Sequence, residues 1–150
     1  MNADGVKVDR VFEVSDELVD AVARLLPQLS TTAKSPDRAA LEKIVASEVS
    51  SMFVARLTSD PDHIAGVITL LVYRIPSGVH AVVEDVVVDE SARGHGVGAA
   101  MLDEAVELAR SRGALHVNLT SRSSREAANR LYKRKGFVIR ETNVYRLNLS

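Results

Sequence analysis

The chain has 150 residues, of which 46% are hydrophobic and 26% charged, the composition of an ordinary globular domain. It contains no cysteine, which excludes disulfides and thiol catalysis. No apolar run approaches membrane-spanning length, and residues 1–5 show neither the basic nor the apolar region of a secretory signal. We therefore expect a single domain over residues 1–150 that works in the cytoplasm without a membrane partner.

Charge is unevenly distributed along the chain. Residues 1–112 carry 11 Lys/Arg and 18 Asp/Glu, whereas residues 113–150 carry 8 and 2, for a net charge of −1. A basic C-terminal third suits a polyanionic ligand, and it suits a solvated helix face equally well. The mildly acidic whole and the 4% aromatic content disfavour nucleic acid as a partner.

Hydrophobic alternation and helical spacing predict the first half of the fold. The expected strands lie at residues 6–14, 52–57, 64–73 and 79–88. A helix begins at Ser15 and ends near Pro27, and Pro36 opens a second helix. Turn residues at 59–62 and 76–78 separate successive strands, so the first half should contain two antiparallel hairpins.

The second half alternates helix and strand. Apolar residues at helical spacing from Val97 predict a helix, and Gly113 takes the left-handed position after its end. Ser123 and Glu126 have the spacing of a capping box that opens another helix, which runs to about Lys135. Further strands are expected at residues 115–120, 138–140 and 144–149. The strand–helix–strand unit around Val97 should be parallel and right-handed, so we predict an α/β fold with a mixed sheet and helices on both faces.

A glycine loop precedes the helix that begins at Val97. Arg93 is followed by Gly94, Gly96 and Gly98, three glycines at every second position. Such a loop lets backbone N–H groups approach an anion, and a helix N-terminus adds partial positive charge. The pattern predicts a phosphate-binding loop, with a purely structural glycine turn as the alternative.

Residues 94–99 also fit the dinucleotide pattern G-x-G-x-x-G/A. A nicotinamide-dependent oxidoreductase wants an acidic residue at the end of the next strand, and residues 118–122 contain none. The two antiparallel hairpins are also incompatible with the all-parallel sheet of a dinucleotide-binding fold. The loop is not a Walker motif either, because it lacks the Lys-Ser/Thr ending. Both interpretations are therefore disfavoured.

Residues 93–99 resemble the Arg/Gln-x-x-Gly-x-Gly/Ala acetyl-CoA loop of the GNAT family of N-acetyltransferases, its small positions falling on the second and third glycines. Two further motifs are similar to the family in the same order. They are the acidic strand at residues 84–88 and an A-x-x-x-Y-x-x-x-G-F helix end at residues 128–137. The resemblance covers about residues 79–137 and implies a mixed, mostly antiparallel central sheet. The string Glu-Asp-Val-Val-Val is similar to the aminosugar-phosphate branch of the family.

The resemblance implies a site for acetyl-CoA, the expected co-substrate, and no metal is expected. The pantetheine arm would lie between the strands at residues 79–88 and 115–120. It would pair with the backbone of Val86, Val87 and Val88. The pyrophosphate would rest on the N–H groups of Gly94, His95, Gly96, Val97, Gly98 and Ala99. Arg93 adds a fixed cation, whereas the His95 side chain is better explained as a solvent-facing loop residue.

A base is useful because an amine must be neutral to attack a thioester. A carboxylate in a valine-rich strand is costly unless it is paired or functional. We favour Glu84 as a base acting through water, with Asp85 as a structural acid. On a regular strand the two face opposite sides, and a bulge would exchange their faces, so the choice between them stays open. A satisfied structural carboxylate is the alternative for each.

Two more groups complete the expected chemistry. A backbone N–H near Val86 is the candidate donor to the oxyanion. Arg125, Asn129 and Tyr132 share one helix face, which suits Tyr132 as the acid that protonates the CoA thiolate and Asn129 as a partner of the pantetheine amide. A packed helix-end aromatic is the alternative for Tyr132.

The sequence therefore indicates an acetyl-CoA-dependent N-acetyltransferase that acts on a primary amine of a small molecule. The alternative is a non-catalytic acyl-CoA-binding regulatory module, which would need neither Glu84 nor Tyr132. The acceptor stays open among aminosugar phosphates, polyamines, amino acids and peptides. A homodimer is the default assembly.

Overall fold

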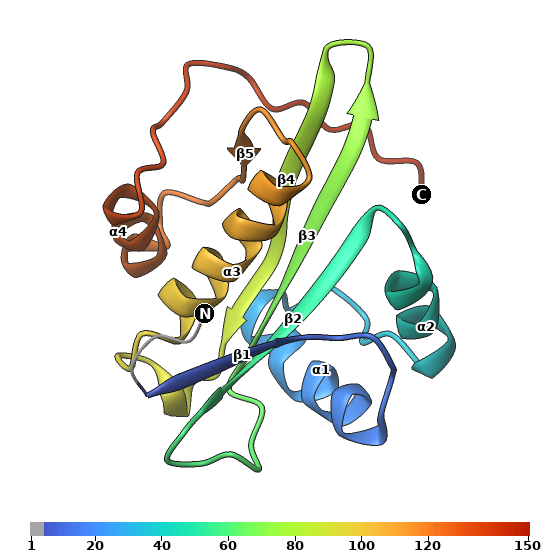
Figure 1. Ribbon diagram of the computed structural model, residues 1–150, viewed down its shortest axis with the longest axis vertical. Helices are drawn as coiled ribbons and strands as arrows, with labels where there is room; N and C mark the ends of the chain where they lie inside the picture. The colour runs from blue at the N-terminus through green and yellow to red at the C-terminus, as the bar shows by residue number, and fades with distance from the viewer. Residues whose placement is uncertain (1–4) are drawn as a thin grey trace. The chain divides into compact units, whose positions relative to one another are not determined.

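The computed structural model describes residues 5–150 (Figure 1). The chain forms two compact units, Met1–Thr120 and Ser121–Ser150, and each is described by itself. This division does not test the single domain predicted over residues 1–150, which stays a prediction. Residues 1–4, on which the expectation of no secretory signal partly rests, lie outside the described residues. In the described part of the chain, no helix is both long and apolar enough to cross a membrane.

The first unit is built on a five-stranded sheet with the order β1-β2-β3-β4-β5. The strands are β1 (Val6–Arg10), β2 (Ser50–Leu57), β3 (Gly66–Ile75), β4 (Gly78–Val88) and β5 (Val117–Asn118). The first four pair antiparallel in sequence order, and β5 pairs parallel to β4. This mixed, mostly antiparallel sheet confirms the predicted fold class and both hairpins.

Helices α1 (Asp16–Leu29), α2 (Arg38–Ala46) and α3 (Val97–Ser111) belong to this unit, with a short 3₁₀ helix, η1 (Glu90–Ala92), after β4. Ser15 caps α1 as predicted, because its hydroxyl accepts a hydrogen bond of 3.1 Å from the Leu18 N–H. The helix ends at Leu29, within two residues of the predicted end near Pro27. Asp37, the residue after Pro36, caps α2 through an N–H bond from Ala40 of 2.8 Å.

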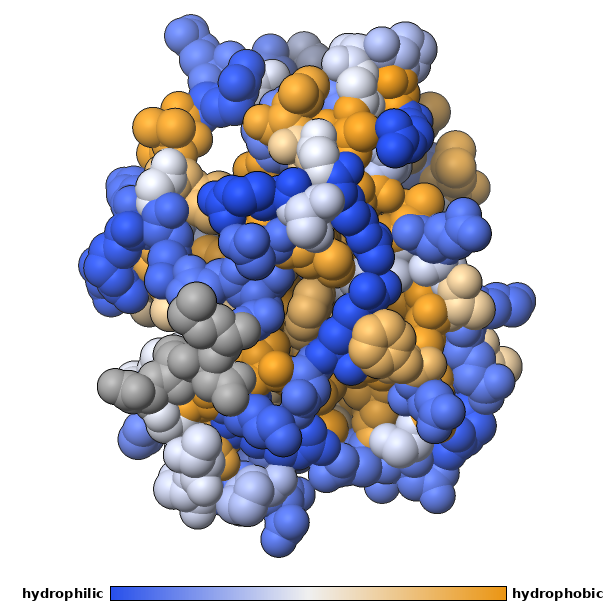
Figure 2. Space-filling view, viewed as in Figure 1, coloured by the Kyte–Doolittle hydropathy of each residue, from blue (hydrophilic) through white to orange (hydrophobic). Residues whose placement is uncertain are grey.

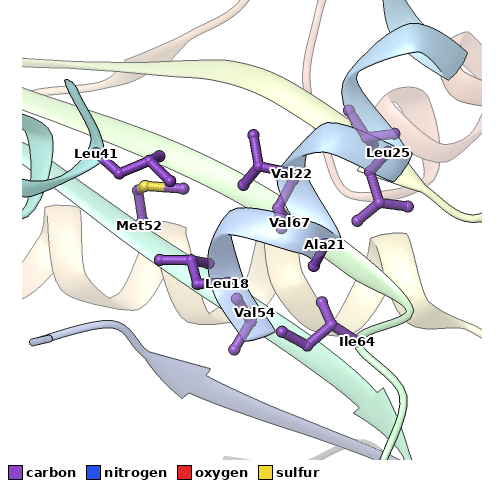
Figure 3. Packing of buried hydrophobic residues seen from close by; sticks show 10 residues of the cluster. Leu18, Ala21, Val22, Leu25, Leu41, Met52, Val54, Ile64 and Val67 are labelled. Atoms are coloured by element: carbon purple, nitrogen blue, oxygen red, sulfur yellow. The ribbon is translucent and has the colours of Figure 1, made fainter. Parts of the chain in front are cut away.

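The core lies on both faces of the sheet. On one face, Leu18, Val22 and Leu25 of α1 belong to one buried cluster with Met52 and Val67 of the strands (Figure 3). Burying each such side chain contributes roughly 1.5–3 kcal/mol. Helix α3 covers the other face so closely that a Cβ added to Gly66 would lie 3.0 Å from the side chains of Met101 and Val97. The predicted helices on both faces are confirmed.

The second unit contains helix α4 (Glu126–Arg134). The predicted capping box is wrong, because α4 starts later, at Arg125 as N-cap, with no side-chain capping bond. The predicted strands at 138–140 and 144–149 are also wrong, since this segment has no regular secondary structure and Leu149 is 94% exposed. An alternating pattern makes a strand only where a neighbouring strand pairs with it. For the same reason the strand predicted at 115–120 shrinks to the two residues of β5 that pair with β4.

Candidate functional site

Strand β4 separates from β5 halfway along its length. The two pair only where Ala81 and Val82 lie opposite Val117 and Asn118. Beyond that point, residues 83–88 have no strand ladder on this edge within the described residues, while β3 pairs with the other edge. An unpaired strand edge offers N–H and C=O groups to an extended ligand. The gap predicted for a pantetheine arm would begin at this fork.

A β-bulge interrupts β4 just past the fork. Val67 lies opposite Val87 and Thr69 opposite Glu84, so two steps along β3 correspond to three along β4. The extra residue lies at Asp85–Val86. Asp85 has φ +49°, and among the described residues it is the only non-glycine with a positive φ. Asp tolerates the left-handed region better than most residues, and bulges often lie beside active sites.

The bulge decides which face Glu84 uses. Directly opposed residues of an antiparallel pair share a face, so Glu84 lies on the face of Thr69, and Val87 on that of Val67. Val67 and Val87 are buried under α1. Glu84 is therefore on the same α1 face as Val87, three residues away, which a regular strand could not achieve. Val87 is buried there, whereas Glu84 remains exposed.

The environment of Glu84 favours a base. Although Glu84 is exposed, desolvation by the surrounding protein, and secondarily the charge of Asp85, raise its pKa above the ordinary value. A carboxylate with a raised pKa is a better proton acceptor near neutral pH.

The glycine loop connects η1 to α3 with its backbone open to solvent. Gly94 and Gly96 have φ of +82° and +79°, and a Cβ on either would meet no atom within 4 Å. Gly96 is the N-cap of α3 and provides no side-chain cap. The first-turn N–H groups of a helix lack helical partners, and Gly96 has no side chain to cap them. The loop with Arg93 and His95 is exposed and fits an anionic group.

The two other predicted residues belong to the second unit. The Asn129 amide donates to the carbonyl oxygens of Arg122 at 2.9 Å and Arg125 at 2.8 Å, which stabilises the start of α4. Tyr132 is buried, and its ring centre lies 6.0 Å from that of Phe137. Burial raises the pKa of Tyr132, and Arg125 opposes the rise. Because Glu84 lies in the other unit, the joint action of Glu84 and Tyr132 stays a prediction.

A polar cluster beside the loop was not found by sequence reasoning. Asp89, the residue after β4, is 8% exposed, and its Oδ2 accepts from Arg24 Nη1 at 3.1 Å and lies 3.0 Å from His63 Nε2. Burial raises the pKa of Asp89, but hydrogen bonds from Ser91, His63 and Gln28, with the charge of Arg24, outweigh it and lower the pKa below its ordinary value. No local motif could signal this cluster, because its members come from three distant segments.

Two surface hollows lie away from Glu84. One of about 610 Å³ is lined mainly by charged side chains of β1, β2 and α1, and one of about 410 Å³ by residues of α1 and the β2–β3 connection. Neither is lined by Glu84 or the glycine loop. The lower part of the view in Figure 2, where β1 and α1 lie in Figure 1, is largely hydrophilic. Among the residues that the structure describes, no three His, Asp or Glu side chains are grouped to hold a metal ion.

This arrangement of sheet, fork and loop is an acetyltransferase fold. An aminoglycoside acetyltransferase from an uncultured soil metagenomic sample, crystallised with trehalose, matches 98% of this chain and 97% of its own, with a TM-score of 0.82 and 20% identity. A Trypanosoma brucei acetyltransferase gives a TM-score of 0.73 at 25% identity, covering 96% and 99%. Glucosamine-6-phosphate N-acetyltransferase from Arabidopsis thaliana gives 0.75 at 18%, covering 95% and 97%.

A comparison with protein-family models identifies the family of the chain, which the fold alone does not. The model of the acetyltransferase (GNAT) family matches residues 17–137, so the chain belongs to the GNAT family. No curated protein sequence matches it. The family membership predicted from the glycine loop and the flanking motifs is confirmed.

Proposed function

We propose that the protein is an acetyl-CoA-dependent N-acetyltransferase that acetylates a primary amine of a small molecule. The observation that carries the proposal is the bulge at Asp85–Val86 of β4. It lies between the fork of β4 and β5 and the glycine loop, and it leaves Glu84 exposed on the α1 face. The proposed base, the strand edge proposed for the cofactor and the proposed anion loop would therefore follow one another along residues 84–99.

Acetyl-CoA, when bound, would supply the acetyl thioester. The unpaired edge of β4 at Val86, Val87 and Val88 would bind the pantetheine arm. The N–H groups from Gly94 to Ala99 would hold the pyrophosphate, with Arg93 as a charged partner. The open space around Gly94 and Gly96 supports this assignment, because a phosphate must approach the backbone closely.

Glu84 would act as the base. It takes a proton from the ammonium form of the amine through a water molecule, and the freed lone pair forms the new C–N bond to the acetyl carbon. The nitrogen then loses its second proton to solvent as the amide forms. A backbone N–H near Val86 donates to the oxygen on which negative charge develops, because the extra residue of a bulge is left out of the strand ladder. Asp85 would hold the bulge and raise the basicity of Glu84.

Tyr132 would complete the transfer. When the C–S bond breaks, its hydroxyl protonates the CoA thiolate and recovers a proton from solvent. The raised pKa keeps the Tyr132 hydroxyl protonated at neutral pH, so it is available as a donor, but it also makes the hydroxyl a weaker acid. Asn129 would accept from a pantetheine amide through its carbonyl oxygen.

The acceptor would approach on the α1 face of β3 and β4. Cross-strand pairing places Leu71, Tyr73 and His80 on the face of Glu84, where all three are only half-buried. The rings of Tyr73 and His80 stack with centres 5.9 Å apart and offer a flat surface to a ring-shaped acceptor. Two similar structures are named for aminoglycoside and glucosamine-6-phosphate acetyltransferases, so amino sugars are the first acceptors to test.

The test is release of CoA from acetyl-CoA with a panel of amines. The panel contains amino sugars with and without phosphate, polyamines, amino acids and peptides, with Glu84→Gln as the matched inactive variant. Amine-dependent CoA release that Glu84→Gln loses supports the proposal. Tight binding of acetyl-CoA without release for any amine would favour the regulatory module. A cytoplasmic location and a homodimer remain predictions.

A further inference from the structure

We propose that Arg24 and Asp89 are positioning residues for the glycine loop. They hold the end of β4 and the start of η1 so that the loop presents its N–H groups in the geometry that binds a pyrophosphate. The inference rests on the proposed function, because it requires the loop to be the acetyl-CoA pyrophosphate site.

Arg24 connects three segments through one guanidinium group. Its Nη1 donates to Asp89 Oδ2 at 3.1 Å, and its Nη2 donates to the Ile64 carbonyl oxygen at 2.7 Å. His63 Nε2 lies 3.0 Å from the same carboxylate oxygen. The helix α1, the connection before β3 and the end of β4 are therefore joined at one point.

Asp89, which Arg24 holds in place, also forms hydrogen bonds with the backbone on either side of the end of β4. Its N–H donates to the Ala65 carbonyl oxygen at 2.8 Å, and its Oδ1 accepts from the Ser91 N–H at 3.3 Å. Helix α1 makes a second contact one residue further on, where Gln28 Oε1 accepts from the Glu90 N–H at 3.0 Å. These bonds determine where the strand ends and in which direction η1 leaves it.

The loop beyond η1 has few contacts of its own. Residues 93–96 are all exposed, and they span the distance between two buried residues, Ala92 and Val97, each 2% exposed. The position of the loop therefore depends on its two ends. Val97 fixes one end within the α3 core, and the Arg24–Asp89 pair fixes the other.

The pair is partly withdrawn from water, with the Asp89 side chain 12% and the Arg24 side chain 36% exposed. Removing one partner of such a pair is costly, because the remaining charge keeps its desolvation penalty. Lysine could not replace Arg24 fully, because two donors in a fixed plane reach two separate acceptors here.

The test compares two thioesters, acetyl-CoA and S-acetylpantetheine, which has the same thioester arm without the pyrophosphate. Arg24→Met keeps the aliphatic stem and removes both donors. We expect it to raise the KM for acetyl-CoA about tenfold, with kcat and the KM for S-acetylpantetheine within about twofold of wild type. Arg24→Lys should recover part of the loss.

The matched control is Arg56→Met. Arg56 on β2 also makes an ion pair with helix α1, through Glu17, but it does not contact Asp89 or the loop. It should leave both KM values unchanged. If Arg24→Met impairs the two thioesters equally, or matches wild type for both, the positioning role is refuted.

Two further measurements keep the outcome interpretable. If Arg24→Met does not fold, Gln28→Ala removes the contact to the Glu90 N–H and the hydrogen bond to Asp89 while it leaves Arg24 in place, and a smaller rise in KM confined to acetyl-CoA is expected. Unchanged kinetics of folded Gln28→Ala would then refute the inference. Calorimetry of wild type with CoA separates the two proposals: no CoA binding by wild type contradicts the proposed function itself. Normal binding by wild type and by folded Arg24→Met contradicts only the positioning role.

Discussion

Replacing Gly96 by valine tests whether the glycine loop binds acetyl-CoA. Gly96 has φ +79°, and an added Cβ would meet no protein atom within 4 Å, so the cost is conformational rather than steric. A non-glycine residue in the left-handed region costs about 1–2 kcal/mol. In a chain of this size that corresponds to a fall in Tm of roughly 2–8 °C. The loop relieves the strain by leaving its conformation, which displaces the N–H groups that would hold the pyrophosphate.

Gly113→Val is a matched control at the other end of α3. Gly113 has φ +80° and the same open space around a Cβ, so both substitutions should cost similar stability. By calorimetry, Gly96→Val should weaken acetyl-CoA binding at least tenfold, about 1.4 kcal/mol, and Gly113→Val should not. Unchanged affinity in folded Gly96→Val would refute the loop assignment. Equal losses in both variants would show that general destabilisation, not the loop, controls binding.

Five other substitutions, at four residues, test the remaining groups. Glu84→Gln should lower turnover by a factor of about 10²–10⁴ at neutral pH, and its turnover should partly recover at high pH. Because the pKa of Glu84 is raised, the kcat/KM of the wild type should fall on the acid side at a higher pH than it would with an ordinary carboxylate. Asp85→Asn should keep most turnover and move that acid limb to lower pH, whereas Asp85→Val should lose turnover; loss in both would make Asp85 the base. Tyr132→Phe should lower kcat by about 10–10³ with little change in the KM for acetyl-CoA, and normal turnover would return Tyr132 to a packing role. Because folding lowers the pKa of Asp89, its ionised carboxylate stabilises the fold at pH values above the pKa of the unfolded chain, and this stabilisation is lost as pH falls through the pKa of the folded state. The difference in unfolding free energy between wild type and Asp89→Asn, measured by urea unfolding, should therefore be constant near neutral pH and shrink below about pH 4. A difference that does not change with pH would contradict this.

The sequence predicted correctly those elements that depend on interactions between residues close together in the chain. The Ser15 cap, the two hairpins and Gly113 after α3 follow from turn and capping chemistry that a few neighbouring residues determine. Helix α1 continues two residues past Pro27, to Leu29, although the proline removes one helical hydrogen bond and its ring crowds the carbonyl four residues earlier. The strands predicted over residues 138–149 failed because pairing depends on a partner edge that the segment itself does not encode.

In the candidate site, too, features that depend on neighbouring residues could be predicted, and features that depend on distant segments could not. The conformation of the glycine loop was predictable because left-handed backbone selects glycine, whereas its binding of an anion stays a prediction. The bulge could be named only as an alternative, since it arises from the register between β3 and β4 and not from the residues of β4 alone. The Arg24–Asp89 pair spans 65 residues, so only the folded chain brings its charges together.

The bulge explains how one short strand can serve both the core and the chemistry. The α1 face of β4 buries Val87, while Glu84, the proposed base, is exposed on the same face three residues earlier. Strict alternation forbids that spacing, because positions three apart point to opposite faces. One extra residue at Asp85–Val86 resolves the conflict, at a cost of about 1 kcal/mol or more for a non-glycine residue in the left-handed region, which aspartate tolerates better than most. The two adjacent carboxylates therefore have different roles. The left-handed conformation of Asp85 forms the bulge, and the bulge places Glu84 in its exposed position beside the fork.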